Sequence, residues 1–536
     1  MKTFCSKDCP DLCDFYIEEK EGEVSFKPAE EKDGRNGFVC SKLKGFYERE
    51  ITRGAEFDPE SLKKAAELIK SLKGQEFLYM RGSGSLGYAM GWWDVLFSKI
   101  SGAVFLDGNP CDITGESAHE YDFGACENPP AANMQNADNI IIFGRNAKVV
   151  SQHLFSYLLK LKKNGKRILY IDPIRTETAP HATDFIQIKP ACDGLLCEAY
   201  LSGDEALAGR AGLTDEEFKL FRSYVENGRT AFITGFGLQR YKNGMASVRW
   251  INRLAVKTGN GHLLYYARGS KAELTSVSAE PVRRVNISLL PDVIEQFPLM
   301  IIVGANPAVT FPETDKWHKA LKKVRLISID TNITETSAHA DVLIRAGGMF
   351  AQKDIMGSYF FKGEPSLRDK FADLPSDSEL AAELAGLLGV KMEIADPERI
   401  ERKEPPSRKY EEKPLESAVP FEGKGYRLIT GSHADYLNSQ VPPSLGRNEA
   451  FVYLSKETAE KEKVADGDML KIFNDTGSFT GRAKISGDLR GDVIFAYKNR
   501  EMTEGYINCA TPSVLTDSRN GIAYYDTFVN MVRKKM

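Results

Sequence analysis

Residues 167–172 read Arg-Ile-Leu-Tyr-Ile-Asp, an unbroken apolar run that ends at a carboxylate. Three earlier runs of this kind, at 77–80, 104–106 and 139–143, each end in a polar, glycine-containing loop. Segments with helical periodicity separate the runs, for example at 152–163. Apolar strands that alternate with helices are typical of a parallel sheet covered on both faces. The sequence therefore predicts a doubly wound α/β fold, in which ligands bind beyond the carboxyl ends of the strands.

The same strand-and-loop pattern occurs a second time, about 158 to 160 residues further along the chain, a period far too long for a solenoid. The matching segments are 171–172 with 329–330, 176–178 with 334–336, 181–182 with 339–340, and 144–146 with 304–306. The repeat indicates two related α/β halves, each with a nucleotide-type site at its strand ends. Asp172 and Asp330 end equivalent strands, and a carboxylate there can bind ribose hydroxyls. Gly82 and Gly84 follow another strand, where backbone N–H groups can approach a phosphate, although a plain tight turn is the alternative.

The first forty residues contain four cysteines: Cys5, Cys9, Cys13 and Cys40. Three thiolates on one tight loop and a fourth from a distance suit a 4Fe–4S cluster, which takes four Cys ligands. The segment 15–26 between them reads as a hairpin that returns the fourth cysteine to the others. Structural zinc usually takes two C-x2–4-C pairs, and disulfides are disfavoured without an export signal. The spacing therefore favours the cluster.

Composition sets outer limits on the fold and function. A chain of 536 residues is long enough for three or four domains. A net charge of −4 without a basic run gives no sign of nucleic-acid binding. No apolar window of about 18 residues occurs, and the N-terminus has no apolar segment or Arg pair. We therefore expect a cytoplasmic protein without a membrane span, unless it is exported on a signal-bearing partner. Nine cysteines then indicate metal or redox chemistry.

The last part of the chain has a different character. A segment rich in Glu, Lys, Arg and Pro reads as a linker between domains. Short apolar segments after it, at 427–429, 451–453, 469–473, 479–485 and 493–495, predict a compact β-barrel. The expected domains are a cluster domain at 1–52, a first α/β domain at 53–110 and 291–397, a second α/β domain at 111–290, a charged linker at 398–425, and a barrel domain at 426–536.

Together these features resemble the molybdopterin oxidoreductase family, the dimethyl-sulfoxide-reductase-type enzymes that hold Mo or W between two molybdopterin guanine dinucleotides. The resemblance covers nearly the whole chain and rests on motifs in a fixed order: the cysteine motif, 144–146, 171–173 with Arg175, 235–240, 305–309 and 508–526. It implies a cluster domain, two pseudo-symmetric α/β domains and a C-terminal barrel. The chain departs from the family at Ala191-Cys192-Asp193, where Gly-Thr-Asp is common, and in being short. The resemblance therefore implies a more open active site, or one covered by a partner subunit.

The resemblance also implies roles for particular residues. Cys111 follows a strand where the family has its Cys, selenocysteine or Ser ligand, and a soft thiolate suits Mo or W; a buried structural cysteine is the alternative. Arg268 lies roughly where formate dehydrogenases of the family keep an anion-binding Arg. Asp112, Glu116 and His119 could include a proton acceptor, or could belong to the start of a helix.

Lys42 stands where family members often place a lysine between cluster and pterin, although a solvated lysine is equally compatible with the sequence. The expected metal ligands are Cys5, Cys9, Cys13, Cys40 and Cys111, and the expected catalytic residues are Cys111, Arg268 and His119. Any single Asp or Asn among the cofactor contacts could instead cap a helix. The remaining candidate cofactor contacts are Gly82, Gly84, Asn146, Asp172, Arg175, Asp193, Gln239, Asn306, Asp330, Ser432, His433, Asn438, Asn508 and Asp517.

The resemblance thus implies a Mo- or W-dependent oxidoreductase that performs two-electron chemistry on a small substrate. Electrons would pass singly through the 4Fe–4S cluster to an Fe–S or flavin subunit, or to a ferredoxin. Two other classes would keep much of the same sequence: a non-redox hydratase or transhydroxylase, and a scaffold subunit that has lost the metal. The presence of Cys111, Asp172 and Asp330 argues against the scaffold.

Overall fold

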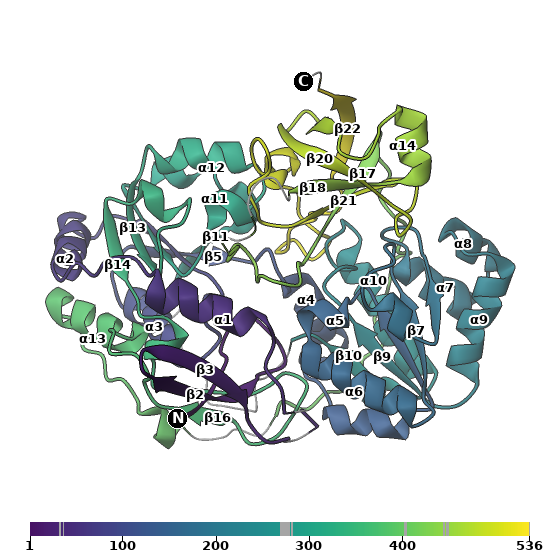
Figure 1. Cartoon of the computed structure of the whole chain (residues 1–536), viewed down its shortest axis with the longest axis horizontal. Coiled ribbons are helices and arrows are strands. Elements are labelled where there is room, and N and C mark those ends of the chain that lie inside the picture. The colour runs from purple at the N-terminus through teal and green to yellow at the C-terminus, as the bar shows by residue number, and fades with distance from the viewer. Residues whose placement is uncertain are drawn as a thin grey trace.

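The computed structural model describes residues 1–31, 34–35, 37–268, 279, 282–400, 405–442, 445 and 450–534. Two α/β domains lie on opposite sides of the molecule in Figure 1, with a β-barrel domain above them and the cysteine domain below. Each α/β domain is built on a parallel sheet whose central strands are fully buried. The predicted α/β fold with a terminal barrel is therefore confirmed.

The sheet of the first α/β domain has the strand order β11-β5-β4-β12-β13-β14, and all its pairings are parallel. Helices cover both faces, as expected for a parallel sheet whose central strands are mostly apolar and buried. The strands are β4 (Phe77–Arg81), β5 (Ala103–Asp107), β11 (Arg283–Asn286), β12 (Leu299–Val303), β13 (Arg325–Asp330) and β14 (Val342–Arg345). The helices are α2 (Ser61–Ser71), α3 (Trp92–Ser98), α11 (Pro307–Thr310), α12 (Thr314–Leu321) and α13 (Asp377–Leu388).

The sheet of the second α/β domain has the order β10-β9-β6-β7-β8 and is also parallel. Its strands are β6 (Asn139–Phe143), β7 (Arg167–Ile171), β8 (Asp184–Ile186), β9 (Thr230–Thr234) and β10 (Leu264–Tyr266). Its helices are α4 (Ile113–Phe123), α5 (Ala147–Val150), α6 (Gln152–Lys163), α7 (Asp193–Ser202), α8 (Glu205–Arg210), α9 (Asp215–Glu226) and α10 (Gly244–Lys257). The helix predicted at 152–163 is observed as α6.

Strand β11 pairs with β5 and so belongs to the first sheet. The expected boundary of the second domain at residue 290 is therefore too late. The sequence of β11 is Arg-Arg-Val-Asn, and only Val285 is buried, so this edge strand has no apolar run to mark it.

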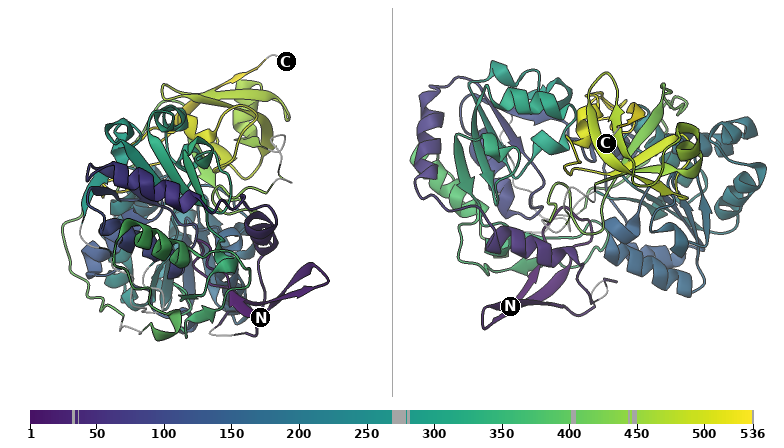
Figure 2. Two further views of the ribbon diagram at one scale, coloured as in Figure 1. Left: turned by 90° about the vertical axis from the view of Figure 1, so that its left-hand side faces the viewer. Right: turned by 45° about the horizontal axis from the view of Figure 1, so that its top comes forward.

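The cysteine domain combines a three-stranded antiparallel sheet with a helical segment. Its elements are β1 (Lys2–Phe4), β2 (Asp14–Lys20), β3 (Glu23–Pro28), α1 (Lys42–Tyr47) and a π-helical turn, η1 (Glu48–Thr52). The predicted hairpin is β2–β3, and Figure 2 shows it projecting from the body of the molecule. A small sheet of β15 (Asp354–Met356) and β16 (Ser366–Arg368) lies against β1.

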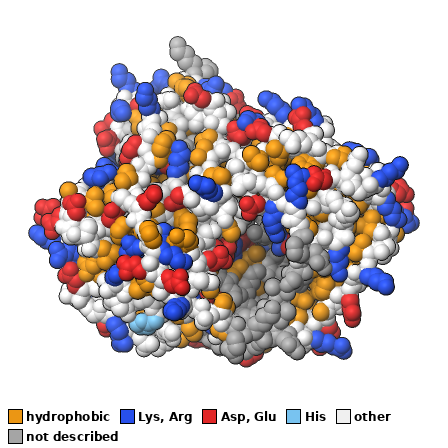
Figure 3. All heavy atoms as spheres, turned by 180° about the vertical axis from the view of Figure 1, so that it is seen from behind, with side chains coloured by type: hydrophobic (Ala, Val, Ile, Leu, Met, Phe, Trp, Pro, Cys, Tyr) orange, Lys and Arg blue, Asp and Glu red, His pale blue; other side chains and the backbone are white. Residues whose placement is uncertain are grey.

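The barrel closes in the order β17-β21-β18-β20-β19-β22. Its elements are β17 (Tyr426–Gly431), β18 (Phe451–Ser455), α14 (Lys456–Glu462), β19 (Met469–Phe473), β20 (Ser478–Ser486), β21 (Val493–Tyr497) and β22 (Phe528–Arg533). Each apolar segment predicted here is a strand. Acidic and basic side chains are interspersed on the face seen in Figure 3. Within the described part of the chain, no helix is long and apolar enough to cross a membrane.

Each α/β domain contains the same kind of tight contact, between two of its own loops at the carboxyl ends of its strands. A Cβ on Gly82, after β4, would lie 2.5 Å from the carbonyl oxygen of Gly304, after β12. In the second domain, a Cβ on Gly235 would meet the carbonyl oxygen of Gly144 in the same way. Glycine is required here because two backbones approach each other directly.

Gly82→Ala and Gly235→Ala should each destabilise the protein, by about 1–3 kcal/mol for an overpacked contact. Gly209→Ala is the matched control, because a Cβ there, within α8, meets nothing within 4 Å. Alanine in a helix should be neutral or stabilising by up to about 1 kcal/mol. Thermal unfolding midpoints of the three variants test this, and equal shifts in all three would contradict the contact.

Candidate cofactor site

Two cavities open at the carboxyl ends of the two sheets. Cavity 1, of about 450 Å³, is lined by loops of the second α/β domain and by the barrel. Cavity 2, of about 790 Å³, is lined by loops of the first α/β domain and by the cysteine domain. The position of each is the one expected for ligands of doubly wound sheets.

The two cavities meet at one place, and residues from the cysteine domain, the second α/β domain and the barrel domain line both of them there. We call this set the junction; its members are Asp8, Cys111, Arg240, Arg268, Thr430, Asn438 and Lys498. A role for Cys111, Arg268 and Asn438 was expected from the sequence, but a role for the other four was not. Asp8 stands directly before Cys9 and Arg240 directly after Gln239, so their neighbours in the sequence were the only signal.

Side chains of Asn109 and Gln239 hydrogen-bond the backbone of the loop that carries Cys111. Asn109 Oδ1 accepts hydrogen bonds from the backbone N–H of Cys111 (2.8 Å) and of Asp112 (3.0 Å). Gln239 Nε2 donates to the carbonyl oxygen of Cys111 at 3.1 Å. Burial, together with the charges of Asp112 and Asp8, raises the pKa of the Cys111 thiol to about 11. The thiol is therefore neutral near pH 7 unless a cation stabilises its thiolate.

Arg268 is fully engaged by carboxylates. Its Nη2 lies 2.6 Å from Asp8 Oδ1, and its Nε donates to Asp112 Oδ2. Burial disfavours the ionised form of Asp8, but Arg268 outweighs this effect and holds the pKa of that carboxyl below its usual value. Asn438 Nδ2 contacts the other oxygen of Asp8 at 3.2 Å. An anion-binding role for Arg268 stays a prediction, and it would require an anion to share the guanidinium with two carboxylates.

Cavity 1 contains two buried carboxyls of the second α/β domain. Asp172 accepts hydrogen bonds from Tyr170 Oη (2.7 Å) and from the N–H of Ile174 (2.9 Å). Burial raises the pKa of Asp172 to about 6. Asp193, the first residue of α7, is 3% exposed, and its Oδ1 has no hydrogen-bond partner among the described residues. Burial and the charge of Asp172 raise the pKa of Asp193 to about 7. An unpaired acceptor that faces a cavity suits a ligand with N–H or O–H donors, such as guanine.

The other predicted contacts of cavity 1 are Asn146, Arg175, Ser432 and Asn438, and all of them line it. Cavity 2 is lined by Gly82, Gly84, Asn306, Asp330, Asn438 and Asn508. Asp330 Oδ1 accepts from the N–H of Thr331 at 2.7 Å, and burial raises the pKa of this carboxyl. Asn508 donates to the carbonyl oxygen of Val309 at 2.8 Å.

Two side-chain bonds of an asparagine at the strand ends are matched in the two halves of the repeat. Asn146 Nδ2 donates to Glu177 (2.6 Å) and its Oδ1 accepts from Thr178 (2.9 Å). In the other half, Asn306 makes the equivalent bonds to Glu335 (2.7 Å) and Thr336 (2.8 Å). The two asparagines therefore brace the strand-end loops of their domains and line the cavities beside them.

Besides the four N-terminal cysteines, five predicted residues line neither cavity: Lys42, His119, Gln239, His433 and Asp517. Gln239 braces the Cys111 loop, and Lys42 Nζ donates to the carbonyl oxygen of Val149 at 3.1 Å. Asp517 accepts from the N–H groups of Met245 and Ala246 and so caps α10. His433 stacks on Tyr436 with ring centroids 4.9 Å apart.

His119 is buried on α4 against Tyr266, and neither ring nitrogen has a partner among the described residues. Burial lowers the pKa of His119 to about 3, so its ring is neutral at ordinary pH. Since His119 lines neither cavity 1 nor cavity 2, the geometry does not bring it to the junction as a proton acceptor.

Burial, together with the charge of Cys40, raises the pKa of Cys5, Cys9 and Cys13, so the four N-terminal cysteines lie near one another. The N–H of Cys5 also bonds the carbonyl oxygen of Cys13 at 2.9 Å, which closes the loop. No group of three or more His, Cys, Asp or Glu side chains in the described residues is arranged to hold a metal ion. The 4Fe–4S cluster therefore stays a prediction.

Comparison with known proteins agrees with this architecture. A family model for molybdopterin oxidoreductases matches residues 93–344, and one for the molybdopterin dinucleotide binding domain matches 426–528. The probable oxidoreductases YyaE and YoaE of Bacillus subtilis (strain 168) are 24% and 23% identical to the chain. These alignments cover 81% of the chain and 82% of YyaE, and 98% of the chain and 97% of YoaE. The structure of acetylene hydratase from Pelobacter acetylenicus superposes with a TM-score of 0.77 at 12% identity, over 99% of each chain.

The chain therefore belongs to the molybdopterin oxidoreductase family. The matched models and the oxidoreductase relatives mark it as an enzyme. The match to the hydratase structure, at this low identity, establishes the fold alone.

The unpaired carboxyl of Asp193 predicts a pH-dependent stability in the cofactor-free chain. Its pKa in the folded state, about 7, lies above the value of about 3.9 of an unfolded chain. As pH rises between these values, the unfolded state loses its proton first, so stability falls and then levels off above pH 7. Asp193→Asn should remove this loss and raise the unfolding midpoint more at pH 7.5 than at pH 5. The gain is at most about 4 kcal/mol for a shift of about three units.

The exposed Asp475 supplies the control, since Asp475→Asn should change stability equally little at both pH values. In cofactor-loaded protein the effect of Asp193→Asn should reverse, because the substitution replaces one of the two acceptor oxygens that face the bound donors with an NH2 group. Thermal unfolding midpoints of the cofactor-free and the cofactor-loaded protein measure this effect. A gain in the loaded form equal to that in the free form would contradict a ligand contact at Asp193.

Proposed function

We propose that this chain is a Mo- or W-dependent oxidoreductase that performs two-electron chemistry on a small substrate at a bis-molybdopterin guanine dinucleotide centre. The observation that carries the proposal is the pair of cavities, one at each half of the repeat, which meet at Cys111. Such a pair of sites suits two similar dinucleotides that share one metal.

The residues at the strand ends fit this cofactor. Asp193, with its unpaired oxygen, and Asp172 offer acceptors in cavity 1, and Asp330 offers one in cavity 2. The loop of Gly82 and Gly84 lets backbone groups come close to a phosphate in cavity 2. Cys111 would ligate the metal, and when bound this centre supplies the two-electron chemistry.

The other junction residues would position substrate and move protons. The ion pairs of Arg268 fix Asp8 and Asp112 beside Cys111. Burial and the nearby charge of Arg240 lower the pKa of Lys498 to about 8, so this lysine exchanges its proton near neutral pH. A group of this kind in contact with the reaction space is suited to general acid–base catalysis.

The electron path in this proposal runs through a 4Fe–4S cluster on Cys5, Cys9, Cys13 and Cys40. The cysteine domain borders both cavities: Asp8 lines both of them, and Lys7 lines cavity 2. A single cluster needs an external electron carrier, so we propose an Fe–S or flavin subunit, or a ferredoxin, as the partner.

Composition analysis of anaerobically purified protein tests the cofactors. We expect about four irons per chain if the four thiolates hold one cubane, together with Mo or W and one releasable guanine nucleotide for each cavity. An anaerobic substrate screen with redox dyes then tests the reaction. Turnover that needs no electron acceptor would replace the redox proposal with a hydratase or transhydroxylase, and protein without Mo or W would point to a scaffold.

Cys111→Ala should abolish dye-linked turnover, because the metal loses its protein ligand, while guanine nucleotide content changes little. Cys126→Ala is the matched control, since Cys126 is also partly buried but lines neither cavity. It should retain activity. Metal content and dye-linked rates of both variants decide the point, and full activity in Cys111→Ala would show the assignment to be wrong.

A further inference from the structure

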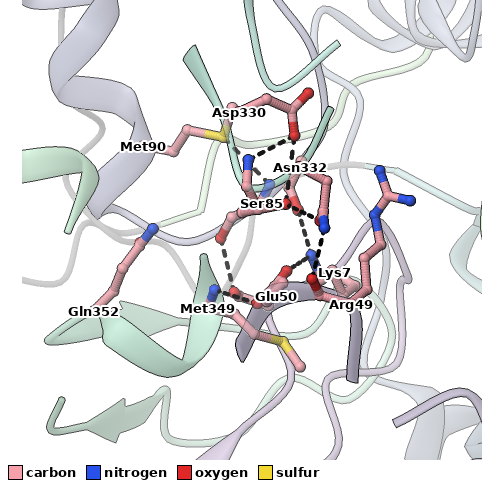
Figure 4. A network of polar contacts seen from close by, with 12 residues as sticks. Lys7, Arg49, Glu50, Ser85, Met90, Asp330, Asn332, Met349 and Gln352 are labelled. Atoms are coloured by element: carbon pink, nitrogen blue, oxygen red, sulfur yellow. Dashed lines mark hydrogen bonds and ion pairs between the residues drawn. The ribbon is translucent and has the colours of Figure 1, made fainter. Parts of the chain in front are cut away.

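One buried ion pair joins the cysteine loop to cavity 2. Lys7 lies between Cys5 and Cys9 in the sequence, and its Nζ pairs with Glu50 Oε1. The side chains are 5% and 0% exposed, and both residues line cavity 2. Figure 4 shows the pair at the centre of a polar network that reaches from the cysteine domain to the end of β13.

The surroundings of Glu50 are built to hold its charge. Glu50 belongs to the π-helical turn η1, a geometry that is frequent at functional sites. Its Oε2 accepts from the N–H of Met349 at 2.9 Å, and a Cβ on Gly348 would collide with the carboxylate. Asn332 Nδ2 ties η1 to the loop after β13 through the carbonyl oxygens of Arg49 (2.7 Å) and Arg53 (2.8 Å).

Lys7 is fixed on the other side of the pair. Its Nζ donates to the carbonyl oxygen of Gly84 at 3.3 Å and lies 5.4 Å from the ring centroid of Phe46. Its charge also favours the thiolate of Cys5. Lys42 instead donates to the carbonyl oxygen of Val149, whose neighbour Val150 lines cavity 1. Lys7 therefore bonds a loop of the first α/β domain, whereas Lys42 bonds a loop of the second.

A buried ion pair is weak support for stability, because desolvation offsets most of the attraction between its partners. Its field is nevertheless strong, since little solvent screens it. The positive end of the pair belongs to the cysteine loop and acts on Cys5, and the negative end belongs to η1. The field of the ion pair can therefore change the free energy of adding charge to a group that the cysteines bind.

We propose that the Lys7–Glu50 pair sets the reduction potential of the iron–sulfur cluster from the side of cavity 2. The inference rests on the proposed function, namely on a cluster at the four cysteines. Reduction adds one electron to the cluster, so the ammonium of Lys7 stabilises the reduced form and raises the potential. The carboxylate of Glu50 opposes this effect, and the two residues act as positioning residues without touching substrate.

Charge-removing variants test the proposal in the full-length holoenzyme. Midpoint potentials are measured by anaerobic redox titration followed by electron paramagnetic resonance of the reduced cluster. We expect Lys7→Met to lower the potential, Glu50→Gln to raise it, and the double variant Lys7→Met/Glu50→Gln to return close to the wild-type value. Lys7→Arg keeps the charge and should keep the potential. Asp122→Asn, which breaks the buried Arg249–Asp122 pair of the second α/β domain, should leave the potential unchanged.

Opposite shifts with recovery in the double variant support the proposal, because a merely structural pair would not produce them. Shifts of the same sign in both single variants, or none, would overturn it. If a single variant does not retain iron, the double variant, which leaves no unpaired charge, and Lys7→Arg decide the question. Loss of the cluster in both of these would show that the pair is structural only. Wild-type protein without iron would instead refute the cluster, and so the proposed function.

Discussion

The arrangement of the four domains depends on the ion pairs of Arg268. This residue follows β10 of the second α/β domain, and it holds Asp112, in the loop after β5, and Asp8 of the cysteine domain. Asn438 of the barrel domain completes the set by bonding Asp8. Removing one partner would leave a buried charge without compensation, which is strongly destabilising. Arg268 and Cys111 line both cavities, so these contacts lie where the two cavities meet.

The sequence predicted those features that arise from local patterns. The buried strands β6, β7 and β12 are apolar runs, and the loops after them repeat the same letters, so the two halves and their strand-end sites could be inferred. Strand β11 could not, because an edge strand with one buried residue has no such pattern. The junction was only partly predictable for a related reason. Asp8, Arg240 and Lys498 are ordinary surface residue types whose role comes from contacts made far along the chain.

The repeat is symmetric in its backbone but not in its ligand contacts. The asparagine networks of the two halves match, yet Asp172 is bonded by Tyr170, while the residue at the corresponding position of β13 is Ser328. A serine is too short to replace the tyrosine hydroxyl, and Asp330 bonds the N–H of Thr331 instead. Cavity 2 is also the larger of the two. The two related halves thus offer differently placed hydrogen-bond acceptors to a ligand.

The charge at the junction follows from these contacts. The carboxylates of Asp8 and Asp112 both form ion pairs with Arg268. Arg240 and Lys498 line the same space and form no ion pair within the described residues. Arg240 lies over the rings of Tyr524 and Tyr525, which leaves its Nε without a hydrogen-bond partner among those residues. The shared lining therefore carries an excess of positive charge in a buried space, where it is little screened. Such a site favours negatively charged groups, and the pyrophosphates and dithiolenes of two pterin dinucleotides would bring several of them toward it.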